Sequence, residues 1–362
     1  LPTAGEVIQY EIHIDRFFRQ GSTHLFRFRF EGTVNGQPLL SMRDGCAGFF
    51  TEDELSSGKG IVIRSMDLQS RPGKRPDDWR DLAPMRPESL SETQINALRQ
   101  GDLVGAFGSE FIGLSLASPA KLPGGRMNLV HRVKSIEPGG GRFGLGRIEG
   151  EADIHPGDWF MVCHFVDDRV MPGTLMYECC LHTLRIYLTR MGWIGEEGEV
   201  AYEPVPGVAS RLRCRGQVIE STRQVTYEVI LKEIGYRPEP YALADAYMYA
   251  DGRLIVEMTD MSLRITGLTR ASVESLWAGR ATAPASRDQS RVATPAPRSA
   301  AAVERSAAIF SRAQLIEFAL GLPSKAFGAR YQAFDHDRFL ARLPNPPYLF
   351  LDRVISTTAA PW

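Results

Sequence analysis

Several features are scarce in this chain of 362 residues, and each shortage excludes a class of protein. No apolar run approaches the length of about 20 residues that a helix needs to cross a bilayer, so no membrane span is predicted. Lysine and arginine together number 42 against 43 for aspartate and glutamate, which gives a net charge of −1. A balanced charge offers no basic footprint for nucleic acid, so neither a membrane nor a nucleic acid is expected as a partner.

Cysteine is also rare, with five residues, none of them at the spacing of zinc ligands. They lie in apolar stretches and their number is odd, so we expect free thiols in a reducing compartment, the cytoplasm. The cluster Asp335-His336-Asp337 has no further ligand residue nearby, so no metal site is predicted. The glycines of residues 139–146 link two predicted strands instead of opening a helix, which argues against a dinucleotide site.

The most informative stretch runs from residue 159 to residue 192. Its first part, residues 159–165, is predicted to be a strand, and a tight polar turn at residues 167–169 follows it. Pro172 and Gly173 then open a long helix, since proline suits the first helical position. Apolar residues fall on nearly every face of this helix, which predicts that it is buried.

Three groups in this stretch have the chemistry of an acid–base site. His164 can remove a proton and return it, and Glu178, 14 residues later, can stay protonated if burial raises its pKa. The N–H of Gly173 at the positive end of the helix can hold an oxyanion. Together they suit proton abstraction next to a thioester carbonyl with loss of a β-hydroxyl. His164 and Glu178 also have purely structural explanations: a satisfied core histidine, and an acid paired with Arg185 or His182.

Around the central helix, the alternation of apolar and polar residues predicts an antiparallel sheet. One long apolar helix wrapped by such a sheet is the pattern of a hot-dog fold, in the α+β class. The strands of this unit are predicted at residues 129–136, 143–154, 210–219, 224–234, 241–250 and 253–265. Three further strands, predicted at residues 5–16, 24–34 and 39–50, precede it with no helix of their own, so something must cover their apolar face.

Two internal repeats define the organisation of the chain. Residues 35–44 match residues 251–260, with Gly252 lying 216 positions after Gly36, and both pairs of turn residues favour a hairpin. Separately, residues 129–135 match residues 350–356 at an offset of 221. The chain is therefore predicted to hold the tail of one unit, a whole unit and the head of a third. Because it also begins without methionine, we expect a piece of a longer polypeptide.

Five domains follow from these repeats and from the local composition. Residues 278–305 are rich in Ala, Ser, Pro and Arg, too poor in large apolar residues to pack, and are expected to be mobile. A helix is predicted at residues 91–99 and another from residue 311 to 320, with a last strand at 348–356. The predicted domains are residues 1–55 (the C-terminal strands of an upstream unit), 56–128 (a connection), 129–268 (the complete unit), 269–310 (a flexible linker) and 311–362 (the truncated start of a further unit).

The run WF–CHF–D-R-VMPG followed by Glu178 resembles the β-hydroxyacyl-ACP dehydratase family, specifically its β-hydroxydecanoyl-ACP dehydratase/isomerase branch. The resemblance implies that His164 and Glu178 are the catalytic pair and that Gly173 supplies the oxyanion N–H. Two positions depart from the family pattern: Arg169 replaces a proline, and His182 replaces a glutamine one turn after the acid. The other residues that the resemblance implies at the substrate and oxyanion site are Cys163, Phe165, Val170, Pro172 and His182.

The repeated units, the Ala/Pro-rich linker and the phrases CAGFF and PPYLFLDRV resemble the tandem dehydratase region of bacterial polyunsaturated fatty acid synthases. That resemblance implies a double hot-dog arrangement within a multienzyme. It also implies dehydration of a 3-hydroxyacyl chain on the phosphopantetheine of an acyl carrier protein to the trans-2-enoyl product, without metal or organic cofactor. Expected partners are the acyl carrier protein and either neighbouring hot-dog units or a homodimer partner.

Several alternatives stay open at the level of sequence. The same fold serves acyl thioesterases and could also be a non-catalytic acyl-binding or scaffolding unit. The acid that faces His164 is either Glu178, from the same or a second copy, or a residue upstream of Leu1. Chain-length preference and isomerisation to the cis-3 product are not readable from these residues.

Overall fold

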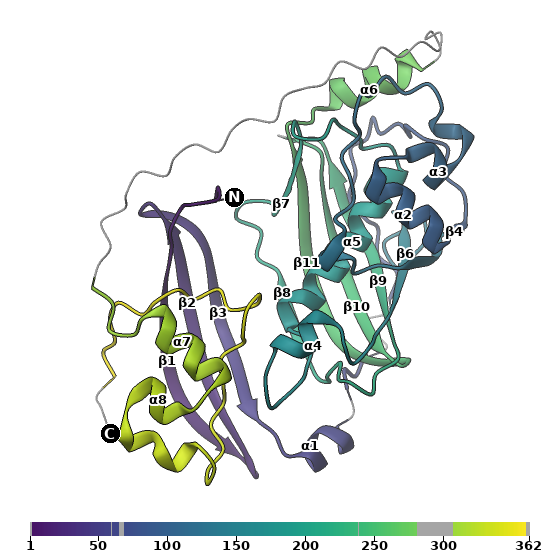
Figure 1. The fold of residues 1–362 in the computed structure, drawn as a ribbon. Helices are drawn as coiled ribbons and strands as arrows, with labels where there is room; N and C mark the ends of the chain where they lie inside the picture. Colours follow the sequence, from purple (N-terminus) through teal and green to yellow (C-terminus); the bar gives the residue numbers. More distant parts are fainter. Residues whose placement is uncertain (1, 59, 65–68, 238, 281–306, 360–362) are drawn as a thin grey trace. The chain divides into compact units, whose positions relative to one another are not determined.

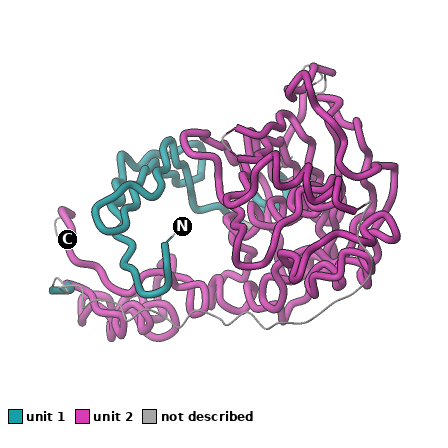
Figure 2. Tube along the Cα trace, turned by 90° about the horizontal axis from the view of Figure 1, so that it is seen from above, with its two compact units in different colours: residues 1–59, 290–308 teal, residues 60–289, 309–362 magenta. Residues whose placement is uncertain are grey.

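The structure is a computed structural model that describes residues 2–58, 60–64, 69–237, 239–280 and 307–359. The chain divides into two compact units (Figure 2). The first comprises residues 1–59 with 290–308, and the second comprises residues 60–289 with 309–362. Each unit contains its own elements, and the candidate site residues all lie in the second.

The first unit is a three-stranded antiparallel meander of β1 (Ile8–Gln20), β2 (Thr23–Val34) and β3 (Gln37–Phe49), followed by α1 (Glu52–Ser57) (Figure 1). The three predicted strands are confirmed. Asn35 and Gly36 turn between β2 and β3 with φ of 51° and 73°, as a two-residue hairpin of this kind needs. Large apolar side chains on β1 remain exposed, among them Ile12 at 57% and Phe17 at 75%.

The second unit is built on an eight-stranded antiparallel sheet that contacts one long helix, α5 (Gly173–Arg190), through β6, β9, β10 and β11 (Figure 1). This arrangement confirms the predicted α+β hot-dog fold. The sheet order is β4 (Glu88–Leu90), β5 (Arg132–Glu137), β6 (Arg147–Asp153), β9 (Gln224–Gly235), β10 (Tyr241–Ala250), β11 (Arg253–Thr266) and β7 (Ala201–Glu203), with β8 (Arg211–Cys214) also on β11.

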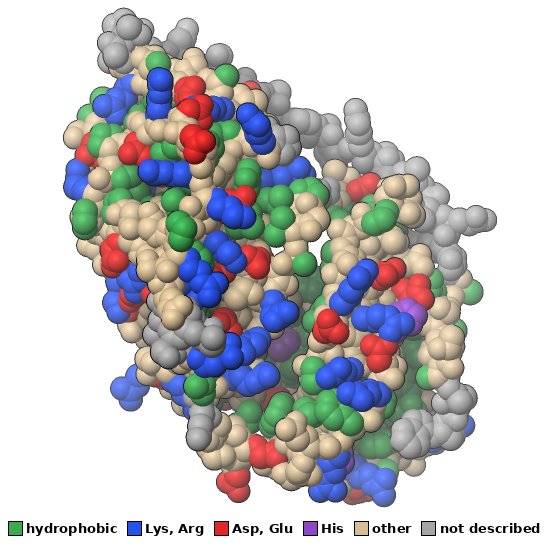
Figure 3. All heavy atoms as spheres, turned by 180° about the vertical axis from the view of Figure 1, so that it is seen from behind, with side chains coloured by type: hydrophobic (Ala, Val, Ile, Leu, Met, Phe, Trp, Pro, Cys, Tyr) green, Lys and Arg blue, Asp and Glu red, His purple; other side chains and the backbone are tan. Residues whose placement is uncertain are grey.

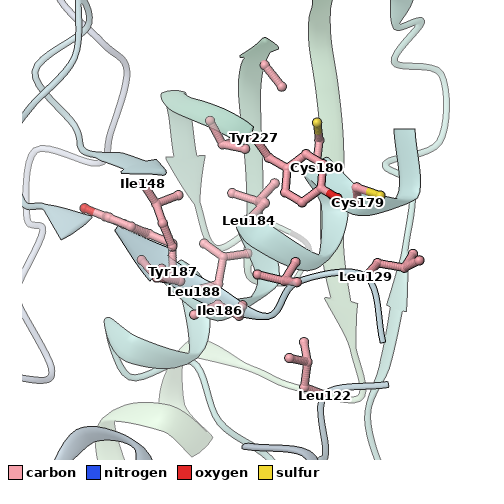
Figure 4. Packing of buried hydrophobic residues seen from close by; sticks show 14 of the residues in the cluster. Leu122, Leu129, Ile148, Cys179, Cys180, Leu184, Ile186, Tyr187, Leu188 and Tyr227 are labelled. Carbon is pink, nitrogen blue, oxygen red and sulfur yellow. The ribbon is translucent and has the colours of Figure 1, made fainter. Parts of the chain in front are cut away.

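Burial on all sides explains why α5 is the centre of this unit. Leu184 and Leu188 share one face of the helix and Ile186 lies on nearly the opposite face, yet all three are completely buried (Figure 4). Each buried side chain of this size contributes about 1.5–3 kcal/mol relative to an exposed one. The neighbouring cysteines also pack in this core, and burial raises the pKa of Cys179 to about 12 and that of Cys180 well above its usual range.

The segment upstream of residue 129 contributes to the same core. It carries β4, α2 (Glu92–Gln100), α3 (Leu103–Phe107) and two short 3-10 helices, Ser109–Phe111 and Gly125–Met127. The predicted helix at 91–99 is confirmed: Ser91 caps α2, and Gly101 follows its end with φ of 78°. Ile95 and Phe107 are buried in the core cluster, so the folded unit extends well before residue 129.

Three predictions at the level of secondary structure are wrong. Residues 159–165 are not a strand but contain α4 (Trp159–Cys163), because Phe160, Met161 and Cys163 are buried while Val162 is exposed, a spacing that fits a helix and not an alternating strand. Residues 348–356 form only one β-bridge, between Val354 and Phe310, because within the described residues they lie beside no extended strand with which they could pair. Pro172 caps α5 and is not its first residue.

The predicted linker at 269–310 also begins later than expected. Residues 270–279 form α6 (Arg270–Gly279), capped by Thr269, and its Trp277 donates from Nε1 to Gly192 O at 2.8 Å. Aromatic and apolar side chains therefore hold this helix on the second unit. The rest of the stretch expected to be mobile, residues 281–305, lies outside the described residues.

The C-terminal segment forms α7 (Arg312–Leu320), α8 (Pro323–Phe327) and a 3-10 helix, Ala329–Phe334, and it repeats the local structure of α2 and α3. The predicted helix from residue 311 is confirmed, with Ser311 as its cap. Gln314 Nε2 donates to Ala326 O at 3.1 Å, just as Gln94 Nε2 donates to Ala106 O at 2.9 Å. These equivalent bonds lie 220 residues apart and support the repeat seen in the sequence.

Charges on the surface are interspersed, as the balanced composition suggests. Lysine and arginine lie beside aspartate and glutamate over much of the face in Figure 3. Arg147 illustrates the pattern, since it pairs with Glu137, Glu149 and Glu228 across β5, β6 and β9. No helix in the described part of the chain is both long and apolar enough to cross a membrane.

Candidate active site around His164

A compact loop places His164 at the end of α4 and beside the start of α5. Val170 N donates to His164 O at 2.9 Å, and Phe165 N donates to Asp168 O at 2.7 Å, so the polar turn closes on itself. Met171 N then donates to Val218 O at 2.9 Å, which ties the loop to the segment after β8. Backbone hydrogen bonds therefore fix the position of the histidine.

The His164 imidazole is oriented by one hydrogen bond. Its Nδ1 lies 2.9 Å from Val170 O, and because a carbonyl only accepts, Nδ1 carries the proton and Nε2 carries the lone pair. Burial lowers the pKa of His164, while the bond to Val170 and the charge of Asp168 oppose that shift. The ring is therefore neutral at pH 7 and has the form that a general base requires.

The first turn of α5 offers an anion site next to this loop. Pro172 is the N-cap, and its carbonyl accepts from the N–H groups of Leu175 and Met176. Gly173 is exposed, and a Cβ placed on it would meet nothing within 4 Å. Its N–H belongs to the first turn, where backbone donors have no acceptor inside the helix. A substrate oxygen therefore has both space and a donor at this position.

Glu178 is farther along α5 and has a different neighbour from the one expected of a catalytic acid. Nε2 of His182 lies 3.2 Å from Glu178 Oε1, at ion-pair distance though not in the direction of a hydrogen bond. Arg185, the other partner considered, instead bonds Lys121 O and lies over the ring of Tyr202. Among the described residues no hydrogen bond joins Glu178 to His164, so the structure brings together the histidine and the helix start but not the acid.

The remaining residues proposed from the sequence surround the histidine in different ways. The Phe165 ring lies 3.9 Å from the His164 ring, centroid to centroid. Val170 acts through its carbonyl, Pro172 caps the helix, and Cys163 is buried with its thiol directed at Phe160 O. His182 is buried on α5, one turn beyond Glu178. All except Glu178 and His182 belong to the loop around His164.

Sequence reasoning missed a residue that touches this loop. Tyr348, from the C-terminal segment, places its ring 5.6 Å from the His164 ring and bonds the hydroxyl of Thr174. The repeat at residues 350–356 marked this segment as the start of another unit, but no local pattern indicates that it contacts a histidine 184 positions earlier. Long-range contacts of this kind are visible only in the folded chain.

A hollow of about 200 Å³ lies on another side of α4. Trp159 and Phe160 of α4 form part of its lining, and Trp159 Nε1 donates to Arg126 O at 2.8 Å. Its lining mixes apolar and polar side chains, including Arg126, His131, Met171 and Tyr227. Within the described residues no group of three His, Cys, Asp or Glu side chains is placed to hold a metal ion.

Residues 122–259, which contain His164, Gly173 and Glu178, match the family model of the FabA-like domain. We refer to this segment as the FabA-like domain, after the family model that it matches. Over 248 residues the chain is also 36% identical to one of the subunits of a polyunsaturated fatty acid synthase from Thraustochytrium sp. (strain ATCC 26185 / S-3). The alignment covers 67% of this chain but 16% of that relative, so the chain spans a small part of the relative's length.

Solved structures resemble the FabA-like domain and its surroundings only weakly. A putative thioesterase from Novosphingobium aromaticivorans is 16% identical, with a TM-score of 0.32, and the match covers 72% of this chain and 73% of that one. A MaoC-like dehydratase is 14% identical, with a TM-score of 0.31, over 73% and 71%. Likeness at this level distinguishes neither dehydratase from thioesterase nor one substrate from another.

Proposed function

We propose that the FabA-like domain is a 3-hydroxyacyl dehydratase that acts on a chain carried by the phosphopantetheine of an acyl carrier protein. The observation that carries this proposal is the His164 ring, whose Nδ1 is held by Val170 O so that Nε2 is left with its lone pair, in the loop that leads into α5. A neutral base next to a helix N-terminus suits removal of a proton α to a thioester carbonyl.

The proposed reaction uses two proton transfers. Nε2 of His164 takes the α-proton, and the C–H electrons form the new double bond while the thioester oxygen gains charge near the Gly173 N–H. The β C–O bond breaks, and the departing hydroxyl takes a proton to leave as water. The product is the trans-2-enoyl thioester. Elimination of water changes no oxidation state and needs no electron carrier, so we propose that the domain works without a metal or organic cofactor.

Glu178 is our proposed source of the proton for the hydroxyl. Its side chain is 39% exposed and lies beside His182 without a hydrogen bond to it, so it can turn toward a substrate or a second unit. We propose that the acid acts across a pair of hot-dog units, with either a neighbouring unit of the same polypeptide or a second copy opposite. Isomerisation to a cis-3 product would need the same base, and the product analysis in the assay would detect it.

The multienzyme context is proposed from the relative named as part of a polyunsaturated fatty acid synthase. An acyl carrier protein on the same or an associated chain would deliver the substrate. A carrier domain within one assembly has a high effective concentration, which makes weak docking sufficient for turnover.

The test is incubation of the full chain with a 3-hydroxyacyl thioester, with products identified by mass spectrometry. The enoyl thioester is expected; free 3-hydroxy acid would instead identify a thioesterase, and unchanged substrate with measurable binding would identify a non-catalytic acyl-binding unit. We expect His164→Ala to lower the rate by about 10²–10⁴-fold, because a general base is lost. His155→Ala is the matched control, since the His155 side chain is 69% exposed and should be dispensable.

A further inference from the structure

The segment just before the second copy of the repeated motif is anchored on α4. Asn345 N donates to Cys163 O at 2.8 Å, and its side-chain Nδ2 donates to Val162 O at 3.4 Å. Both acceptors are carbonyls at the C-terminal end of α4, where backbone oxygens have no partner inside the helix. Asn345 is 8% exposed, so its side chain is committed to this contact.

From this anchor the chain turns and presents Tyr348 to the site. Tyr348 N donates to Asn345 O at 2.9 Å, which closes the turn. The Tyr348 ring then packs edge-on to the His164 ring, with centroids 5.6 Å apart and planes at 82°, and lies 6.0 Å from the ring of Trp159. Its hydroxyl forms a hydrogen bond with the hydroxyl of Thr174.

Tyr348 thus touches both halves of the candidate site at once. Its ring contacts the proposed base, and its hydroxyl contacts the residue that follows the Gly173 oxyanion donor. Burial raises the pKa of Tyr348, so the phenol stays protonated and can donate to Thr174. The Val170 carbonyl fixes only one edge of the imidazole, and a ring packed against it limits rotation about the remaining side-chain torsions.

We propose that Tyr348 is a positioning residue of the His164 site, supplied by the repeat that follows the FabA-like domain. The site is then composite: the loop around His164 comes from the FabA-like domain, and a wall over it comes from the segment that begins the next sequence repeat. Asn345 holds this wall on the end of α4. The kinetic part of this inference rests on the proposed dehydratase function, whereas the contact itself does not.

The first experiment is independent of any substrate. The full chain is treated with diethyl pyrocarbonate, and the rate of modification of His164 is measured by peptide mass spectrometry relative to the exposed His155. Tyr348→Ala should raise the relative rate at His164 severalfold, because the ring over the imidazole is gone. Tyr348→Phe keeps the ring and should leave that rate near the wild-type value. An unchanged rate in Tyr348→Ala would overturn the proposal, whatever the enzyme assay shows.

The second experiment separates positioning from simple closure of the site. With the 3-hydroxyacyl thioester, Tyr348→Ala should lower kcat about tenfold or more with a smaller change in KM, and Tyr348→Phe should recover most of the loss. A rise in kcat/KM would show that Tyr348 blocks the site instead of organising it, which refutes the proposal. Tyr331→Phe is the control, because its ring packs on Phe327 and Phe334 and not on the His164 site.

The first experiment tests the contact between Tyr348 and His164, and the second tests its effect on the proposed reaction, so either result can be negative without the other. If neither wild type nor variants dehydrate the thioester but the modification rate still responds to Tyr348→Ala, the proposed function is wrong and the composite site stands. If Tyr348→Ala does not fold, Tyr348→Leu removes the aromatic ring but keeps an apolar side chain, and the same rise in the modification rate of His164 is expected. An unchanged rate in Tyr348→Leu would overturn the proposal.

Discussion

Arg190 provides a demanding test of how far the folded unit extends. It is the last residue of α5 and is completely buried. Its guanidinium bonds Glu88, at the start of β4, and lies 3.0 Å from Glu110 Oε2. It therefore joins the central helix to the segment that the sequence indicated as a mere connection. Replacing it with methionine keeps an apolar stem but leaves two partly buried carboxylates without this partner.

We expect Arg190→Met to lower the free energy of unfolding by about 3–5 kcal/mol, the usual cost of removing one partner of a buried ion pair. Urea denaturation followed by circular dichroism measures this as a shift in midpoint at an unchanged slope. Adding Glu88→Gln to the same variant removes the charge that has lost its partner and should recover part of the loss, whereas Glu110 keeps its ion pair with Arg86. Arg312→Ala is the control, because Arg312 is 53% exposed in its pair with Asp352 and such pairs contribute at most about 1 kcal/mol.

A loss below about 1 kcal/mol in Arg190→Met would refute the reasoning, since an exposed pair costs no more than that. It would mean that residues 88–110 do not pack on α5 in solution. Limited proteolysis of the same variant independently tests whether residues 88–110 pack on α5. Cleavage should appear first between α2 and the 3-10 helix Ser109–Phe111, because these lose their tie to α5.

Three further predictions concern titrating groups. Burial lowers the pKa of His164 from its usual 6.5, so the acidic limb in the pH profile of kcat/KM should have its midpoint below pH 6.5. A midpoint at or above pH 6.5 would contradict a neutral, desolvated base. Burial also lowers the pKa of His131, so below pH 6.5 the unfolded chain binds more protons than the folded chain. The free energy of unfolding should therefore fall as the pH drops through 6.5. Urea melts whose midpoint does not change with pH would contradict this prediction. Burial raises the pKa of Cys179 to about 12, so iodoacetamide at pH 8 should label the exposed Cys46 in the native protein and reach Cys179 only after denaturation; native labelling of Cys179 would show that α5 is not enclosed as described.

The repeat between the two units is preserved in backbone conformation as well as in sequence. Asp44 in β3 has φ of 56°, and Asp260 in β11, 216 positions later, has φ of 58°. Few residue types other than glycine, asparagine and aspartate adopt this conformation readily, which explains why aspartate occupies both places.

An ion pair occupies equivalent positions of the two repeats with its signs reversed. Asp15 pairs with Arg29 in the first unit, and Lys232 lies 3.8 Å from Asp245 in the second. A pair of this kind needs opposite signs but not a particular order, so both charges can be exchanged together. The repeat therefore constrains the shape of the strands more strongly than the identity of their side chains.

Local chemistry by itself determined much of this protein. Some signals act over only a few neighbouring positions, and the sequence predicted these correctly. They are the alternation along β1–β3 and β9–β11, the turn residues at 35–36 and 251–252, and the caps Ser91 and Ser311. The apolar run after Gly173 predicted a buried helix for the same reason, since its period is a property of the segment. The motif around His164 likewise lies within one loop, and its members stay together in the fold.

Only the tertiary structure decided the features that depend on contacts with segments distant in the sequence. Residues 159–163 became a helix and residues 350–356 failed to become a strand because the available neighbours, and not the local pattern, set their backbone. The partner of Glu178 is His182, and the partner of His164 is a tyrosine from the far end of the chain. Contacts between distant segments depend on how the whole sheet and helix pack, so no spacing within the sequence could identify Tyr348 as the residue that lies against the histidine.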